Sequence, residues 1–373
     1  MIDQRNKPQA STGPYFPALD GLRGFAILLI LLYHNFNFNG IFEAAWIGVD
    51  LFFALSGFLI TDILLRKKDS RHFLSDFYMR RVLRIFPIYY ISLSFFLFIL
   101  PLFISYPFNL QYFLRNQQWF WLYAQNWLFI LKNSDNNNFL NHYWSLALEE
   151  QFYLIWPWII LMVKIPQKLI TLLLCILTGL LAIRIVVWLL HIETLPYETM
   201  YKFTRIDSLC AGSILAAVRF KAGYRIRFPD KLMGVLLAIS ILLVLPAIKL
   251  IFNARLPYFV CCFYPLIGLF WVSIVNSSLQ EKSFLFKIFN NTILRFFGKI
   301  SYGLYIFHWP VYMLFESKTP SWSNLYGLSS FTASLLAAFV STALSVILAL
   351  ISYYCIEIHF LKLKRFFISE QRP

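Results

Sequence analysis

The sequence has few charged residues, and this scarcity separates it from soluble proteins. Asp, Glu, Lys and Arg make up 14% of the 373 residues, whereas hydrophobic residues make up 59%. Soluble domains carry roughly 25% charged and about 45–50% apolar residues. Glycine, proline and cysteine are also sparse, at 14, 16 and 5 residues, which excludes a collagen-like, a disordered and a disulfide-rich chain. The composition therefore predicts a polytopic membrane protein.

Several common catalytic and binding motifs are also missing. The sequence has no G-x-S-x-G elbow, no P-loop, no G-x-G-x-x-G and no C-x-x-C pair, and no metal-ligand spacing stands out, so we expect no metal site. The five cysteines lie within apolar stretches and are predicted to be small buried hydrophobic residues. The first residues are polar and proline-rich, so a cleaved signal peptide is not expected.

Long apolar stretches predict an all-α polytopic membrane protein. A helix needs about 20 mainly apolar residues to cross the hydrocarbon layer. One further stretch, 119–131, is too short to cross and rich in aromatic residues, so we expect one interfacial or re-entrant helix there. About ten stretches are predicted to be transmembrane helices: 18–36, 46–65, 85–104, 143–163, 168–190, 203–220, 232–251, 257–277, 297–315 and 330–354.

The distribution of positive charge predicts the orientation. The net charge is +15, and Lys and Arg concentrate in every second segment between the predicted spans, as the positive-inside rule requires. Both termini are then cytoplasmic, with tails at 1–17 and 357–373 around a transmembrane domain at 18–356. Membrane topology and lipid contact explain the basic charge, so no nucleic-acid partner is expected.

Ionisable residues inside predicted spans are the strongest functional signal, because an unpaired charge in a bilayer is costly. The first span contains Arg23 and His34, eleven positions apart. This separation is about three helical turns, or roughly 16 Å, and it places both side chains on one helix face. That face could line a path from the cytoplasmic boundary to a reaction centre in the outer half of the membrane.

Other polar residues are predicted at the level of His34. A neutral histidine backed by a carboxylate is a general-base arrangement. Glu149 and Glu150 are adjacent on a helix, so we expect only one of them to face a given cavity, and the sequence leaves open which. His142 is predicted to be a loop residue without a special role. The polar residues expected at this level are Asp50, Glu149, Glu150, Arg205, Asp207 and His308.

A cluster of arginines precedes the third predicted span. Arg80, Arg81 and Arg84 lie in the segment RRVLRIFPIYY, with Arg80 and Arg84 on one helical face. A guanidinium group near a membrane is costly unless it meets an anion, and its fork suits phosphate. We therefore predict a phosphate-bearing ligand on the cytoplasmic side. Binding to anionic lipid is the alternative for the neighbouring basic loop.

Six blocks in order resemble the acyltransferase-3 family of integral membrane acyltransferases, which includes bacterial O-acetyltransferases of surface and secreted glycans. The resemblance covers about residues 16–360. The blocks are ALDGLRGFAILLILLYH, GVDLFFALSGFLIT, RRVLRIFPIYY, HYWSLALEEQFYLIWP, RIDSLCAG and GKISYGLYIFHWP. The family's Arg-x10-His pair corresponds to Arg23 and His34. The C-terminal Glu-x-Pro of many members is Glu357 followed by Ile358 and His359 here, so no role is expected there.

The resemblance implies a multi-pass protein of the bacterial inner membrane that uses cytoplasmic acetyl-CoA, or another acyl-CoA, and a glycan or lipid-linked sugar as acceptor. Arg80, Arg81 and Arg84 would hold the donor phosphates, and Arg23 would guide the thioester arm. His34 would deprotonate the acceptor hydroxyl. The residue that orients the imidazole would be Glu150 or, as alternatives, Glu149 or Asp50.

Three alternatives remain open from the sequence. A covalent acyl-enzyme could form on His34, Ser56 or Ser145, although neither serine has a base at a recognisable spacing. The same polar track could belong to a transporter that exports a glycan or lipid-linked sugar without acyl transfer, although no inverted repeat is visible. A structural or regulatory membrane protein without activity is the third.

Overall fold

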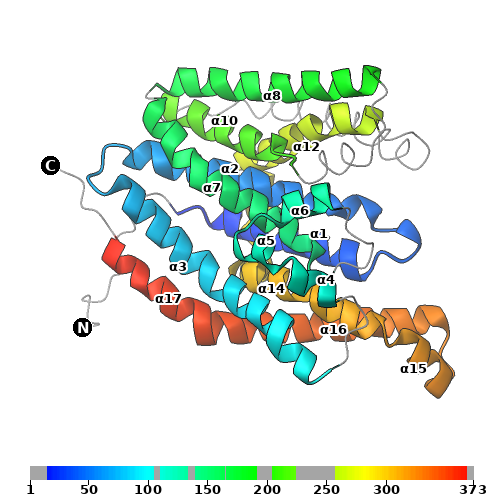
Figure 1. Ribbon diagram of the computed structural model, residues 1–373. Coiled ribbons are helices and arrows are strands. Elements are labelled where there is room, and N and C mark those ends of the chain that lie inside the picture. Colours follow the sequence, from blue (N-terminus) through cyan, green and yellow to red (C-terminus); the bar gives the residue numbers. More distant parts are fainter. Residues whose placement is uncertain are drawn as a thin grey trace.

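The computed structural model describes residues 15–104, 110–132, 139–163, 165–190, 204–223 and 257–367. All regular secondary structure in these ranges is helical, and no strand occurs among them. The all-α prediction is therefore confirmed for this part of the chain. The long helices pack side by side, with α8 along one margin and α3 and α16 along the opposite one (Figure 1).

Most helices of the described part fall close to the predicted stretches, but the helix Phe73–Ser94 begins well before the predicted span 85–104 and ends before it does. The predicted span 232–251 lies outside the described residues. The main helices are α1 (Pro17–Asn35), α2 (Gly48–Lys67), α3 (Phe73–Ser94), α7 (Trp144–Met162), α8 (Pro166–Leu189), α10 (Asp207–Lys221), α12 (Pro257–Ser278), α14 (Thr292–Glu316) and α16 (Ser330–Ser352). The shorter α4 (Leu110–Arg115), α13 (Phe284–Phe289) and α15 (Thr319–Tyr326) lie between them.

Five described helical stretches are long and apolar enough to cross a membrane, and they overlap five of the predicted spans. The helices α7, α10, α12 and α14 also occupy predicted spans, but α10 has only 15 residues. The five stretches are Pro17–Asn35, Glu43–Lys67, Phe73–Leu102, Pro166–Val187 and Ser330–Phe367.

Large apolar side chains cover the outside of the helical bundle. In the apolar stretch of α8, only 11% of the residues are buried, and Ile183 is 55% exposed. On α16, Phe339 is 59% exposed, and on α7, Met162 is 80% exposed. A water-soluble protein does not present such continuous apolar helix faces. These faces suit lipid, so the described part is that of a membrane protein with its polar groups inside.

Two helix pairs approach so closely that only glycine fits between their backbones. A Cβ atom on Gly24 of α1 would lie 1.9 Å from the carbonyl oxygen of Leu294 on α14, and one on Gly298 would lie 1.8 Å from that of Asp20. Gly57 of α2 and Gly212 of α10 form a second contact of this kind. Small residues let membrane helices pack backbone to backbone. The first contact fixes α1 against α14, which carry His34 and His308.

The aromatic segment at 119–131 is two short helices, where the sequence predicted one. These are α5 (Gln117–Trp121) and α6 (Gln125–Leu131). The break lies at Tyr123, which has a positive φ of 51°. The side-chain amide of Gln151 on α7 donates to the Tyr123 carbonyl oxygen at 2.8 Å. A buried carbonyl that has left its helix needs such a donor, and this tertiary contact stabilises the break.

The C-terminal segment is helical up to Phe367. After α16, a π-helical turn, η7 (Tyr353–Glu357), leads into α17 (Ile358–Leu363) and then into η8 (Lys364–Phe367). The predicted tail from residue 357 therefore begins within a continuous helical stretch. The Nε of Arg80 donates to the carbonyl oxygen of Phe367 at 2.8 Å, which fastens the end of this stretch to α3.

The prediction that all five cysteines are buried is wrong for two of them. Cys210 is buried, whereas Cys175 on α8 and Cys355 on η7 are exposed. Both exposed cysteines lie on helices at the outside of the bundle, where lipid replaces protein as the apolar environment. The side chains of Cys261 and Cys262 lie outside the described part.

Candidate active site

A cavity lies between α1, α2, α3, α7 and α14. Its empty volume is about 820 Å³, including space open to the surroundings. One end carries the guanidinium groups of Arg23, Arg81 and Arg84, and the lining elsewhere is aromatic or aliphatic with a few polar groups. The residues that line it are Arg23, Val49, Phe52, Phe53, Ser56, Leu59, Ile60, Arg81, Arg84, Ile85, Ser145, Leu146, Glu149, Glu150, Tyr153, Ser301, Tyr302 and Tyr305.

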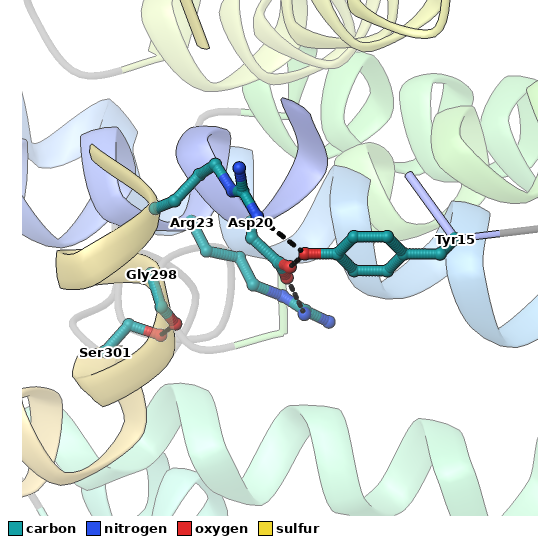
Figure 2. A network of polar contacts seen from close by, with 6 residues as sticks. Tyr15, Asp20, Arg23, Gly298 and Ser301 are labelled. Carbon is teal, nitrogen blue, oxygen red and sulfur yellow. Dashed lines mark hydrogen bonds and ion pairs between the residues drawn. The ribbon is translucent and has the colours of Figure 1, made fainter. Parts of the chain in front are cut away.

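Arg23 is held at the cavity wall by the first turn of its own helix. Its Nη1 lies 3.2 Å from Oδ1 of Asp20, one turn earlier on α1. The Tyr15 hydroxyl donates to the other carboxylate oxygen of Asp20 at 2.8 Å. Figure 2 shows this network beside Gly298 and Ser301 of α14. The pairing limits the directions that the Arg23 guanidinium group can take.

His34 and His308 form a hydrogen-bonded pair near the opposite end of the site. Nδ1 of His34 lies 2.7 Å from Nε2 of His308, and the rings are stacked with centroids 5.0 Å apart. Nδ1 of His308 lies 2.8 Å from the carbonyl oxygen of Tyr305. A carbonyl only accepts, so Nδ1 of His308 carries the proton. In a neutral His308 the Nε2 then accepts from Nδ1–H of His34, so in a neutral His34 the basic lone pair is on Nε2.

The two rings of this pair differ in burial. His308 is completely buried at 0% exposure. His34 is half-buried, and the rings of Tyr33 and Trp309 lie beside it, with centroids 5.0 and 4.7 Å away. Burial disfavours a charged imidazole, so His308 suits a neutral, orienting role. His34 is the member of the pair that a reactant can approach.

A third histidine, His142, packs against the pair. It is in the short helix η6 (Asn141–Tyr143), and its ring centroid is 5.2 Å from that of His308. Its Nε2 lies 3.3 Å from the carbonyl oxygen of Ile306. Pro310, four residues later on α14, has no N–H for this carbonyl, so the imidazole of His142 supplies the donor. Burial lowers the pKa of His142 well below its ordinary value, which favours the neutral ring.

Tyr305 and Ser145 close the cavity on the side of the histidines. The two hydroxyl oxygens are 2.5 Å apart, and the Tyr305 hydroxyl donates to the carbonyl oxygen of His142 at 2.9 Å. The Tyr305 ring centroid lies 5.5 Å from that of His308. His34 is not among the residues that line the cavity. It is linked to the lining through His308, whose ring lies beside that of Tyr305.

Glu149 and Glu150 both line the cavity, so the expectation that only one would face it is wrong. Neighbouring helical residues diverge by about 100°, but a cavity this wide spans that angle. The Ser56 hydroxyl donates to Oε1 of Glu149 at 2.8 Å, and the Tyr153 hydroxyl donates to Ser56 at 3.0 Å. The predicted role of either glutamate beside His34 stays a prediction, because the described contacts give His34 a different neighbour, His308.

Asp50, the third predicted partner of His34, is part of another cluster. Its Oδ2 lies 3.7 Å from Nη2 of Arg205, and the Ser208 hydroxyl lies 3.3 Å from its Oδ1. Arg205 itself lies against the rings of Trp46 and Trp144, 4.7 and 4.9 Å from their centroids. Asp50 is 2% exposed. This carboxylate balances a buried guanidinium group.

The three arginines of the RRVLR segment divide between two cavities. Arg81 and Arg84 line the first cavity, and Arg81 also lies over the Tyr153 ring, 5.4 Å from its centroid. Arg80 lines a second cavity, to which Arg81 also contributes. All three are on α3, which begins at Phe73, so the helix extends seven residues before Arg80. The arginine cluster expected from the sequence therefore lies between two cavities.

Sequence reasoning assigned no role to two residues of this site, His308 and His142. His308 was expected at the level of His34 but not as its partner, because a pair across 274 residues of sequence leaves no local signal. His142 resembled a loop residue because a single turn, η6, holds it. Pro310, four residues after Ile306, was the sequence feature that indicated that a side chain must donate to the Ile306 carbonyl oxygen.

The described residues contain no group of three or more His, Cys, Asp or Glu side chains that could hold a metal ion. The cavity instead offers guanidinium groups at one end, which suit a phosphate-bearing cofactor. The two carboxylates of the lining, Glu149 and Glu150, interact electrostatically with Arg81, and the remaining lining is uncharged. A long ligand with an anionic head and a neutral tail fits this division.

The fold and the site define a class: an all-helical membrane protein with an internal, arginine-lined cavity that ends beside a histidine pair. Residues 16–353 match the family model described as an acyltransferase domain. The chain belongs to this family of membrane acyltransferases, the acyltransferase-3 family. The resemblance found in the sequence is thereby confirmed.

Three curated bacterial proteins illustrate the relationship. Peptidoglycan O-acetyltransferase OatA of Listeria monocytogenes is 34% identical over 80% of this chain and 50% of its own length. Putative peptidoglycan O-acetyltransferase YrhL of Bacillus subtilis is 33% identical over 80% and 49%. O-acetyltransferase OatA of Staphylococcus aureus is 30% identical over 81% and 51%. The chain thus spans about half the length of the curated relatives that it matches. No solved structure matches it.

Proposed function

We propose that this protein is a membrane O-acetyltransferase. It moves an acetyl group from acyl-CoA on the cytoplasmic side to a hydroxyl of a glycan, or of a lipid-linked sugar, on the other side of the bacterial inner membrane. The relatives are named for peptidoglycan O-acetylation, which makes peptidoglycan the first acceptor to test. Both termini are cytoplasmic in this proposal, with a transmembrane domain at 18–356.

The observation that carries the proposal is the hydrogen bond from His34 to His308 beyond the end of the arginine-lined cavity. This bond assigns the proton of a neutral His34 to Nδ1 and its basic lone pair to Nε2, on a ring that is only partly buried. An acceptor hydroxyl beside Nε2 gives its proton to His34 and attacks the carbonyl carbon of the thioester. The thiolate of CoA then leaves and takes a proton, and the acyl ester remains on the acceptor.

The protein contributes position and charge to this reaction. Arg23, Arg81 and Arg84 bind the phosphates of the donor, and the narrow pantetheine arm extends along the cavity toward Tyr305 and Ser145. His308 keeps Nδ1 of His34 engaged and thereby fixes the reactive tautomer. The Tyr305 side chain separates the cavity from the histidines, so it has to rotate before the thioester meets His34. Holding the two reactants together supplies much of the acceleration.

Direct transfer to the acceptor is the simpler mechanism, because the base and the acceptor side are adjacent. Ser56 and Ser145 are the serines that an acyl-enzyme would use. Ser56 has a carboxylate partner in Glu149, but both serines lie on the donor side of Tyr305, and neither contacts a histidine ring among the described contacts. The role of Glu149, Glu150 and Asp50 in this proposal is to balance the positive charge of the arginines.

The test uses the full-length protein in inside-out vesicles supplied with radiolabelled acetyl-CoA and peptidoglycan fragments inside the vesicles. Label should reach the glycan with the wild-type protein, and His34→Ala should lower the rate by about 10²–10⁴-fold, the usual contribution of a placed base. His359→Ala, which changes an exposed histidine on α17, is the matched control. Transfer that persists in His34→Ala would exclude the mechanism, and glycan export without label would favour the transporter.

A further inference from the structure

A second cavity lies beside the first, between α2, α3 and the C-terminal turn η8. Its empty volume is about 620 Å³, including open space. It shares Arg81 with the first cavity, so the two are neighbours on either side of α3. The residues that line it are Ile63, Leu64, Lys67, Ser70, Phe73, Asp76, Phe77, Arg80, Arg81 and Lys364.

The polar lining of this cavity has an excess of positive charge. Four cationic side chains face one carboxylate, that of Asp76. The nearby carboxylate of Asp62 is already engaged, because Nε of Arg66 lies 3.0 Å from its Oδ2. Cations gathered in a space bounded by protein repel one another unless an anion joins them. The cavity therefore lacks negative charge that a ligand would supply.

Two donors in the cavity have no hydrogen-bond acceptor within the described part of the chain. They are the ammonium group of Lys67 and the hydroxyl of Ser70, and both atoms are buried. Buried polar atoms in native proteins are nearly always paired, so these two atoms mark the place of an absent acceptor. Lys67 ends α2, and Ser70 is in the turn that follows, so a short local segment presents both donors.

The C-terminal helix contributes Lys364 from the opposite side. The hydrogen bond from Arg80 to the Phe367 carbonyl oxygen holds η8 against α3 and keeps Lys364 at the cavity. The charges of Arg84, Arg81 and Arg80 all act on Lys364. The carboxylate of Glu357 also acts on Lys364 and Arg84, and it offsets only part of the positive charge gathered here. This segment lies outside the residues 16–353 that match the family model.

We propose that this second cavity binds a phosphate monoester, and that the phosphate is the 3′-phosphate on the ribose of coenzyme A. This inference rests on the proposed function. A monoester carries close to two negative charges near neutral pH and offers three acceptor oxygens, which suits Lys67, Ser70, Arg80 and Lys364. The pyrophosphate then lies at Arg81 and Arg84, and the thioester arm occupies the first cavity, the one that leads toward His34.

The experiment compares acetyl-CoA with acetyl-dephospho-CoA, which lacks only the 3′-phosphate, as donors for the full-length protein in vesicles. The wild-type protein should show a kcat/KM about 10- to 100-fold higher for acetyl-CoA, because hydrogen bonds to charged groups of this kind contribute that much. Lys67→Met and Lys364→Met should each reduce this ratio mainly by raising KM for acetyl-CoA, with kcat kept. Lys362→Met, which changes an exposed lysine on the preceding helix α17, should leave the ratio unchanged.

A second arm distinguishes the nucleotide from a lipid headgroup as the source of the phosphate. The assays are repeated in vesicles of phosphatidylcholine alone and of phosphatidylcholine with phosphatidylglycerol. Equal kcat/KM for the two donors, with activity that depends on the anionic lipid and on Lys67, would overturn the assignment to the nucleotide. Equal kcat/KM in both vesicle types and in all variants would overturn the phosphate site itself. Absence of transfer from acetyl-CoA in the wild type would instead contradict the proposed function.

Discussion

Two clusters of charged side chains in this protein differ in burial and in how the charge is balanced. In the first, Arg184 of α8 forms a bidentate pair with Asp207 of α10, with both N–O distances at 2.7–2.8 Å, and Arg205 pairs with Asp50. Two guanidinium groups thus meet two carboxylates, and all four residues are at most 5% exposed. In the second cluster, around α3, cationic side chains outnumber carboxylates and line two cavities.

The difference separates a scaffold from a binding site. A balanced cluster has no charge left for a ligand, and its geometry joins helices α2, α8 and α10. An unbalanced cluster is costly in the free protein and gains stability when an anion binds. The same residue type, arginine, therefore has opposite meanings in the two places, and the number of carboxylates within reach decides which applies.

The largest expected effect comes from breaking the balanced cluster. Arg184→Leu leaves the Asp207 carboxylate buried without its partner, which should lower the free energy of unfolding by about 3–5 kcal/mol. The double variant Arg184→Leu with Asp207→Leu should recover most of this loss. Thermal unfolding in detergent, followed by tryptophan fluorescence, measures both. Lys168→Leu, an exposed site on α8, is the control, and equal melting temperatures of Arg184→Leu and the wild type would contradict a scaffold role.

The unbalanced cluster should respond in the opposite way. Arg84 has no ion pair within 4.0 Å in the described ranges. The cations that act on it, Arg23, Arg81 and Lys364, outnumber the one such carboxylate, Glu357, so Arg84→Gln should leave the melting temperature unchanged or slightly higher. The KM for the acyl-CoA donor should rise about 10- to 100-fold. Steady-state kinetics and melting of the same sample test the contrast. The comparison fails if Arg84→Gln destabilises the protein as strongly as Arg184→Leu does.

The smallest expected effect concerns Ser56, which lies between Glu149 and Tyr153 inside the first cavity. In direct transfer its hydroxyl only supports a glutamate that does not contact the reacting atoms, so Ser56→Ala should reduce kcat/KM by less than about tenfold. If Ser56 were the nucleophile, its removal would lower kcat by several orders of magnitude. Trapping with labelled donor in the absence of acceptor is the complementary measurement, and a stable acyl-enzyme on Ser56 would refute direct transfer.

The sequence sufficed for most of the helices, and the polar track from Arg23 to His34 stays a prediction. The apolar stretches predicted the ends of most helices to within a few residues. They could do so because a run of about 20 apolar residues is a local property of the sequence. Arg23 and His34 could be placed on one face because both are on α1. The arginines of α3 were found for the same reason, since a charge beside a membrane span stands out against apolar neighbours.

Contacts between distant segments could not be predicted in this way. The pairing of His34 with His308 depends on Gly24 and Gly298 bringing α1 and α14 together, and no spacing in one helix shows such an approach. The break at Tyr123 depends on Gln151 from another helix. The wide cavity that accommodates both Glu149 and Glu150 is likewise a property of five packed helices.

The central claim is that the donor and the acceptor reach His34 from opposite sides of the membrane. The direct measurement uses proteoliposomes in which a protease site added to the N-terminal tail reports the orientation of each protein molecule. With labelled acetyl-CoA only on the side of the N-terminal tail and an impermeant glycan acceptor only on the other side, the account predicts labelled glycan. Transfer that occurs only when both reactants share one compartment would contradict it.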